Sequence, residues 1–221
     1  MRYIILISVL VLSGCNTIPS GWSAKCRLPA NTVTYNEETD AYKFTLDGDE
    51  SDYCFDDGRR NRKDRAEIDR PVKKDQYYVI EFDFKYEGLG GATFFQIHPG
   101  RPSHIREDIY FDCPPIQISA YFREVRLDIP GVTEQEALSS GGYKGEWHKI
   151  TAEFKLSNKS PSYKFYFDDQ LSFESKDNVG LMCFYDSTVP KASLGLYRGD
   201  HNKVETVEFR NISLRAGKME Q

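Results

Sequence analysis

Strict alternation of apolar and polar residues is the feature that most constrains how this chain can fold. The clearest run is QYYVIEFDFKY at residues 76–86, where Tyr78, Ile80, Phe82 and Phe84 recur at every second position. A period of two places these side chains on one face of an extended strand, whereas a helix would repeat every 3.6 residues. The run therefore predicts a strand with one buried face.

Similar runs recur along the chain and are separated by Gly, Pro, Asn and Asp clusters. They lie at residues 115–123, 147–156, 162–167, 170–174, 194–197 and 204–214. In the first of these, Ile116, Ile118, Ala120 and Phe122 are expected to share one face. Asp168-Asp169 is typical of a hairpin turn, and only TEQEAL at residues 133–138 indicates one or two helical turns.

Short strands at this spacing predict an all-β fold, a sandwich or jelly roll of two antiparallel sheets. The outward face of one sheet can then curve into a concave groove lined by polar and aromatic side chains. The chain has 221 residues and a net charge of −5, which argues against broad nucleic-acid binding. Residues 59–74 nevertheless hold eight basic and three acidic residues. This run is either a solvated face or a local positive patch that recruits an anionic polymer.

The N-terminus reads MRYIILISVLVLSGC and predicts an export signal. Its apolar run, residues 3–12, is too short to span a bilayer but suits a signal peptide. The sequence LSGC is similar to the bacterial lipobox, which implies a lipid on Cys15 and attachment to a membrane without crossing it. Asn16 after the cysteine implies the outer membrane. The predicted organisation is a signal peptide at residues 1–14, a lipidated tether at 15–22 and one domain at 23–221.

Four cysteines remain for the exported domain, and an even number in an oxidising compartment favours two disulfides. They allow three connectivities, of which we favour one local pair and one pair joining distant loops; free buried thiols are the alternative. The favoured pairs are Cys26–Cys54 and Cys113–Cys183.

Three separated segments place polar residues on one face of their predicted strands. In residues 64–70, FFQIH and residues 192–198, the apolar residues at alternate positions face inward. Gly195 is expected to let a substrate approach the backbone closely. If the strands share a sheet, the outward positions collect Arg65, Glu67, Asp69, Gln96, His98, Ser193, Gly195 and Tyr197.

The order of these segments resembles that of alginate-lyase-like and heparin-lyase-like polysaccharide lyases, which have a concanavalin-like jelly roll. The matching motifs are Arg65-Ala66-Glu67, Gln96-Ile97-His98 and Gly195-Leu196-Tyr197. The last motif is incomplete, because Ser193 and Ala192 stand where the family usually has Lys and Phe. Arg198 resembles the heparin-lyase form, and Gly145-Glu146-Trp147-His148 resembles a turn of concanavalin-like sandwiches.

The resemblance implies β-elimination in a uronate polymer, with no cofactor required. Arg65 and Gln96 would stabilise the charge that develops on the carboxylate, and Glu67 would orient Arg65. His98, whose type has an ordinary pKa of about 6.5, would take the C5 proton. Tyr197 would donate a proton to the leaving oxygen, and in some geometries could itself act as the base. Further residues expected to bind substrate are Glu67, Arg198, Tyr121, Arg123 and Trp147.

Two other functions remain open. A retaining glycosidase would need a second carboxyl beyond Glu67-Ile68-Asp69, but Val72 occupies that position. A non-catalytic glycan-binding surface lipoprotein would use Tyr121, Trp147 and Tyr197 as stacking platforms. Alginate, glucuronan and glycosaminoglycans all present the reacting atoms, and endo or exo action is not distinguished. The many aspartates are compatible with a structural Ca²⁺, although no run has an ordered ligand spacing. A monomer is expected.

The lipobox yields a direct test. Cys15→Ser removes the only atom that can accept the lipid at this signal, so the protein should leave the membrane fraction or accumulate as unprocessed precursor. Labelled fatty acid should enter the wild-type protein and not the variant. A wild-type protein that takes up no label would contradict lipid attachment.

Overall fold

The computed structural model describes residues 18–24, 32–47, 65–98, 116–129, 136–157, 159–175, 189–197 and 203–217. All regular secondary structure in these ranges is β-strand, and the strands form two antiparallel sheets of seven strands each. Within the same ranges, no helix is long and apolar enough to cross a membrane. The predicted all-β class is confirmed.

The first sheet, called sheet A, carries all three polar segments found in the sequence. Its strands, in order across the sheet, are β1 (Ser23–Ala24), β4 (Arg65–Pro71), β13 (Lys191–Tyr197), β6 (Ala92–His98), β7 (Ile116–Ala120), β8 (Glu124–Asp128) and β9 (Glu136–Ser140).

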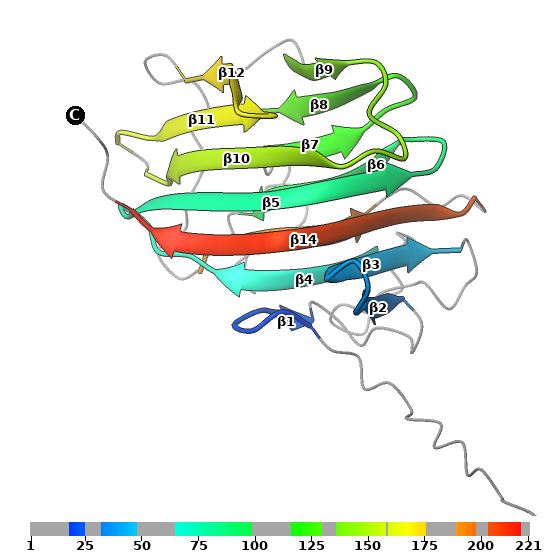
Figure 1. Ribbon diagram of the computed structural model, residues 1–221. Coiled ribbons are helices and arrows are strands. Elements are labelled where there is room, and N and C mark those ends of the chain that lie inside the picture. The colour runs from blue at the N-terminus through cyan, green and yellow to red at the C-terminus, as the bar shows by residue number, and fades with distance from the viewer. Residues whose placement is uncertain are drawn as a thin grey trace, which may run out of the picture.

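The second sheet, called sheet B, covers one face of sheet A. Its strands, in order, are β12 (Gln170–Glu174), β11 (Ser162–Phe167), β10 (His148–Lys155), β5 (Tyr77–Glu87), β14 (Glu205–Ala216), β3 (Ala41–Leu46) and β2 (Val33–Asn36). In Figure 1 the strands of both sheets lie along nearly the same axis, with neighbours antiparallel, and each sheet is stacked from β9 and β12 at the top to β1 and β2 at the bottom.

The core lies between the two sheets and is rich in aromatic rings. The alternation in β5 is confirmed, because Tyr78, Ile80, Phe82 and Phe84 are all buried there. Phe82 lies 5.5 Å from Phe95 of β6, measured between ring centroids. Such pairs add about 0.5–1.5 kcal/mol to the stabilisation gained from burial alone. The side chains that alternation predicts to face inward therefore pack the two sheets against each other.

A β-bulge in β6 breaks the strict alternation. Phe94 and Phe95 are adjacent in sequence, yet both are buried in the core. The pairing of β6 with β7 shifts between Thr93 and Phe95, which inserts an extra residue and re-aims one side chain. Phe94 then stacks on Phe84 at 4.6 Å. The outward face of the strand is kept by Gln96 and His98 beyond the bulge.

Two local predictions are wrong. Residues 136–138 of the segment expected to be helical belong to strand β9, which pairs with β8 at the edge of sheet A. Pairing with a neighbouring strand overrides the weak helical preference of so short a segment. Phe122 does not share the core face with Ala120, because the chain leaves β7 at Ala120 and turns. Its side chain is 67% exposed.

Gly195 allows two strands to approach each other. Its φ is +139°, and an added Cβ would lie 2.7 Å from the Cα of Glu67 and closer still to the carbonyl oxygen of Ala66. No side chain fits there unless β4 moves. The expectation that this glycine makes room for substrate is therefore corrected: its lack of a side chain makes room for the backbone of β4.

The close approach at Gly195 predicts a large loss of stability on substitution. Gly195→Ala should lower the free energy of unfolding by about 3 kcal/mol or more, because backbone strain and a backbone collision add. Gly142→Ala is the matched control, since Gly142 also has positive φ but open space around its Cβ position. It should cost about 1 kcal/mol. Equal losses in denaturant titrations would contradict the collision.

Candidate active site

The sheet register brings the three predicted segments together on the outer face of sheet A. Strand β13 lies between β4 and β6 and pairs with both. Ser193 stands opposite Gln96 on one side and Asp69 on the other. Tyr197 stands opposite Arg65, and Lys191 opposite His98. Polar positions predicted only from alternation therefore form a continuous surface across three neighbouring strands.

A buried carboxylate organises the centre of this surface. Glu67 is 2% exposed, and its Oε1 accepts a hydrogen bond from Nε2 of Gln96. Its Oε2 lies 3.1 Å from Nε of Arg65, an ion pair without the alignment of a hydrogen bond. Glu67 was predicted both to orient Arg65 and to touch substrate. The carboxylate is engaged by the arginine and the glutamine, so its placement fits the first role and is poorly suited to the second.

A second buried carboxylate holds the only lysine of β13. Asp69 accepts a hydrogen bond of 2.7 Å from the hydroxyl of Ser193 and one of 3.1 Å from Nζ of Lys191. The side chain of Lys191 is 45% exposed. Sequence reasoning missed this lysine, although alternation places it on the same face as Ser193. In the lyase families that the sequence resembles, a lysine usually stands at position 193. In this chain the lysine stands two residues earlier, at position 191.

The two residues proposed for proton transfer lie at opposite ends of the polar surface. Tyr197 is partly exposed, and the guanidinium carbon of Arg65 lies 4.6 Å from its ring centroid. His98 is also partly exposed. The partner of Tyr197 in β6 is Thr93, five residues from His98, which corresponds to about 16 Å along the strand. A sugar ring must therefore lie between them, above Gln96, if both are to act on it.

The other residues predicted to bind substrate fall in different places. Tyr121 continues the outer face of sheet A beyond β7, and the guanidinium carbon of Arg126 lies 4.7 Å from its ring centroid. Arg123 is exposed in the same turn. Trp147 instead stacks on Arg210 at 4.1 Å, on the outer face of sheet B. The prediction that Trp147 shares a groove with Tyr197 is therefore wrong, because it precedes a strand of the opposite sheet.

Several predictions fall outside the described residues. They are the lipidation site Cys15, the cysteines Cys26, Cys54, Cys113 and Cys183, the basic residues 59–64, and Arg198. In the ranges that the structure describes, no group of three or more His, Cys, Asp or Glu side chains is arranged to hold a metal ion. The structural Ca²⁺ stays a prediction.

No protein-family model and no curated protein match the sequence. Solved structures do share its fold over most of its length. An alginate lyase from Corynebacterium sp. aligns with a TM-score of 0.59 at 11% identity and covers 86% of this chain and 82% of its own. A mutant of alginate lyase Aly36B in complex with alginate tetrasaccharide aligns with a TM-score of 0.59 at 11% identity, over 91% and 88% of the two chains.

A sialidase shares the fold as well, with a TM-score of 0.55 and 11% identity. It covers 88% of this chain, but this chain spans only 17% of the sialidase. At such low identity these matches establish architecture alone. The chain has the jelly-roll sandwich found in alginate lyases, as predicted.

The buried ion pair yields a stability test. Glu67→Gln leaves the largely buried Arg65 guanidinium without its counter-ion, so the free energy of unfolding should fall by about 3 kcal/mol. Glu81→Gln is the matched control, because Glu81 pairs with Arg215 on the exposed face of sheet B. That variant should lose less than about 1 kcal/mol. Similar losses in denaturant titrations would show that the Glu67 pair does not organise the site.

Proposed function

We propose that this protein is a polysaccharide lyase that cleaves a uronate-containing anionic polymer by β-elimination. The observation that carries the proposal is the cluster in which Glu67 holds both Arg65 and Gln96 beside the partly exposed Tyr197. A guanidinium and an amide fixed together are suited to a carboxylate whose charge grows during reaction. The fold, shared with alginate lyases, is compatible with this chemistry.

The first requirement of β-elimination is to make the C5 proton acidic enough to remove. Arg65 and Gln96 bind the adjacent carboxylate and stabilise the enolate-like charge that forms on it. The amide nitrogen of Gln96 has two hydrogens, and Glu67 accepts only one of them. The second hydrogen could bind the substrate carboxylate only if the buried amide becomes accessible, because Gln96 is 2% exposed. Glu67 acts through its two partners and is a positioning residue.

The second requirement is a pair of proton transfers. His98 takes the C5 proton, the electrons of the C5–H bond form the C4–C5 double bond, and the C4–O bond breaks. Tyr197 gives its phenolic proton to the departing oxygen. Both side chains are partly exposed on the outer face of sheet A, at either end of the Gln96–Glu67 pair. For both to act, the two side chains must lean toward a sugar ring bound between them, above Gln96.

Lys191 compensates for the serine at position 193. It lies opposite His98, and Asp69 holds its ammonium group in place. Gln96 and Lys191 are diagonal neighbours on adjacent strands, typically about 7–8 Å apart. When one sugar carboxylate of the substrate binds at Gln96, the carboxylate of the neighbouring sugar therefore lies near the ammonium group of Lys191.

The alternative function is a non-catalytic glycan-binding protein on the same scaffold. The burial of Gln96, which is 2% exposed, favours this alternative because substrate has little access to its amide. A retaining glycosidase is less well supported, since Glu67 and Asp69 are each paired with a cation and Val72 stands where the second carboxyl is required. The outer-membrane lipid anchor, the monomeric state and the absence of a cofactor remain proposals from sequence.

Turnover separates these functions. A panel of alginate, glucuronan and glycosaminoglycans should include one polymer on which the protein generates the ultraviolet absorbance of a double bond conjugated to a carboxylate. On that polymer, His98→Ala should lower kcat by roughly 10²–10⁴-fold through loss of the general base. Tyr197→Phe should lose turnover comparably but keep binding, since the ring remains.

Asn36→Ala, on the edge strand of sheet B, is a control that should leave kcat unchanged. Full activity in Tyr197→Phe would reject its role as acid. Binding to a polymer without new absorbance, on any member of the panel, would favour the glycan-binding alternative.

A further inference from the structure

The turn between β7 and β8, residues 121–123, is held by hydrogen bonds at one end of these two strands of sheet A. The amide of Tyr121 donates a hydrogen bond of 2.8 Å to the carbonyl of Glu124. The carbonyl of Tyr121 accepts one from the buried hydroxyl of Tyr143. Burial, with a smaller effect from the charge of Glu205, raises the pKa of Tyr143, so its hydroxyl keeps the proton that it donates.

The neighbouring turn between β5 and β6, residues 88–91, packs directly against this one. A Cβ on Gly90 would lie 2.7 Å from the carbonyl carbon of Tyr121. Gly91 donates a 2.6 Å hydrogen bond to the carbonyl of Ala120. Nζ of Lys144 donates one of 2.7 Å to the carbonyl of Gly88. The two turns support each other, so a side chain at their tip is presented with little freedom.

That side chain is Phe122, which is 67% exposed and stands among cations. Nζ of Lys144 lies 5.1 Å from its ring centroid, and the guanidinium carbon of Arg123 lies 5.7 Å from it. Arg126 and Tyr121 form a second pair of this kind beside it. We call these five residues the Phe122 platform. Aromatic and arginine side chains are enriched in binding hot spots, so an exposed ring grouped with cations is a candidate contact surface.

The charge of the platform is positive. Glu124 is an acidic neighbour, and its carboxylate accepts a hydrogen bond of 2.6 Å from Nε of Arg126. Among the residues that the structure describes, no ion pair joins Arg123 or Lys144 to a carboxylate. The chemistry that fits an aromatic ring between two cations is a sugar that carries a carboxylate, with its apolar face on the ring.

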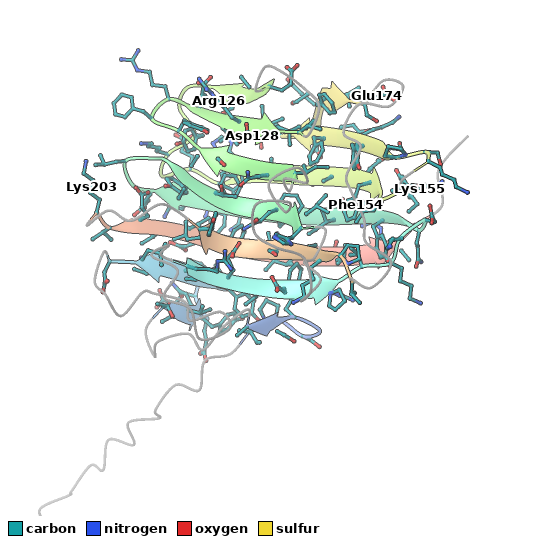
Figure 2. All side chains as sticks on the ribbon, turned by 180° about the vertical axis from the view of Figure 1, so that it is seen from behind. Arg126, Asp128, Phe154, Lys155, Glu174 and Lys203 are labelled. Atoms are coloured by element: carbon teal, nitrogen blue, oxygen red, sulfur yellow. The ribbon has the colours of Figure 1, made fainter. Side chains whose placement is uncertain are left out.

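One row of side chains connects the platform to the candidate active site. Arg126 stands opposite Ser119, Ser119 opposite Thr93, and Thr93 opposite Tyr197. Tyr197 in turn stands opposite Arg65. Four strand spacings separate the first and last of these residues, about 19 Å in all. Figure 2 shows Arg126 on β8, at the far side of sheet A from β4.

We infer that the Phe122 platform is a remote subsite that binds the polyuronate chain some sugars away from the cleaved bond. A polymer lying across the strands follows the row from Arg65 to Arg126. Phe122 lies near the end of that row, in the turn that joins β7 and β8. The inference rests on the proposed function for the identity of the ligand. A preference of the protein for long over short polymers would then depend on a turn outside the catalytic cluster.

Affinity electrophoresis through gels containing alginate, glucuronan or hyaluronan tests the subsite on the full protein without requiring turnover. Wild-type protein should be retarded by at least one polymer, and Phe122→Ala should weaken that binding about tenfold. Phe122→Tyr should restore it, because the ring is kept. The disaccharide of the same polymer is too short to reach from Arg65 to Phe122, so its affinity in calorimetry should not change.

Trp147→Ala is the matched control, since it removes an aromatic ring stacked on a cation on the opposite sheet. It should migrate like wild type. The inference is overturned if no polymer retards the wild-type protein, if Phe122→Ala binds as wild type, or if it weakens the disaccharide equally. It is also overturned if Phe122→Ala alters only binding to vesicles containing an anionic lipid, which would make the platform a membrane contact.

The two proposals fail differently. Retardation that depends on Phe122 without new ultraviolet absorbance would keep the subsite and reject the lyase. Turnover with a KM for long polymer that is unchanged in Phe122→Ala would keep the lyase and reject the subsite. If both hold, the substitution should raise KM for long polymer about tenfold and leave kcat unchanged.

Discussion

The backbone of β4 runs so close to Gly195 that no side chain fits between them, and the polar surface of sheet A depends on this contact. It fixes how β13 pairs with β4, and β13 in turn pairs with β6. A slip of one residue would turn every outward side chain of a strand toward the core. The pairing therefore sets which residues of three distant segments meet, before any side chain makes a contact.

Buried ion pairs dominate the centre of that surface. Glu67 and Asp69 are successive outward residues of one strand, and each takes a cation and a neutral hydrogen-bond donor. Burying such carboxylates is costly unless charge and hydrogen bonds are satisfied together. The arrangement contributes little net stability for that reason, but it fixes the geometry of Arg65 and Gln96. Preorganisation of this kind is what a charge-stabilising site requires.

Alginate lyases and part of a sialidase share the architecture of this chain. The shared fold therefore does not fix the function, which has to be argued from the residues of a site. Polar residues extend across the outer face of sheet A from Arg65 to Arg126, along a row that crosses five strands. Under the proposed function, this extended surface is where the anionic polymer would lie.

Period-two alternation in the sequence was enough to determine the all-β class, the inward faces of β5, β10 and β13, and the outward positions of Gln96 and Tyr197. Those features are local, because the direction of a strand side chain follows from its position in the strand. Only the tertiary structure decided which strands are neighbours. It brought Lys191 opposite His98, moved Trp147 to the other sheet and exposed Phe122 at a turn. These outcomes depend on register, sheet membership and the point where a strand ends, all of which are set by contacts between residues far apart in the chain.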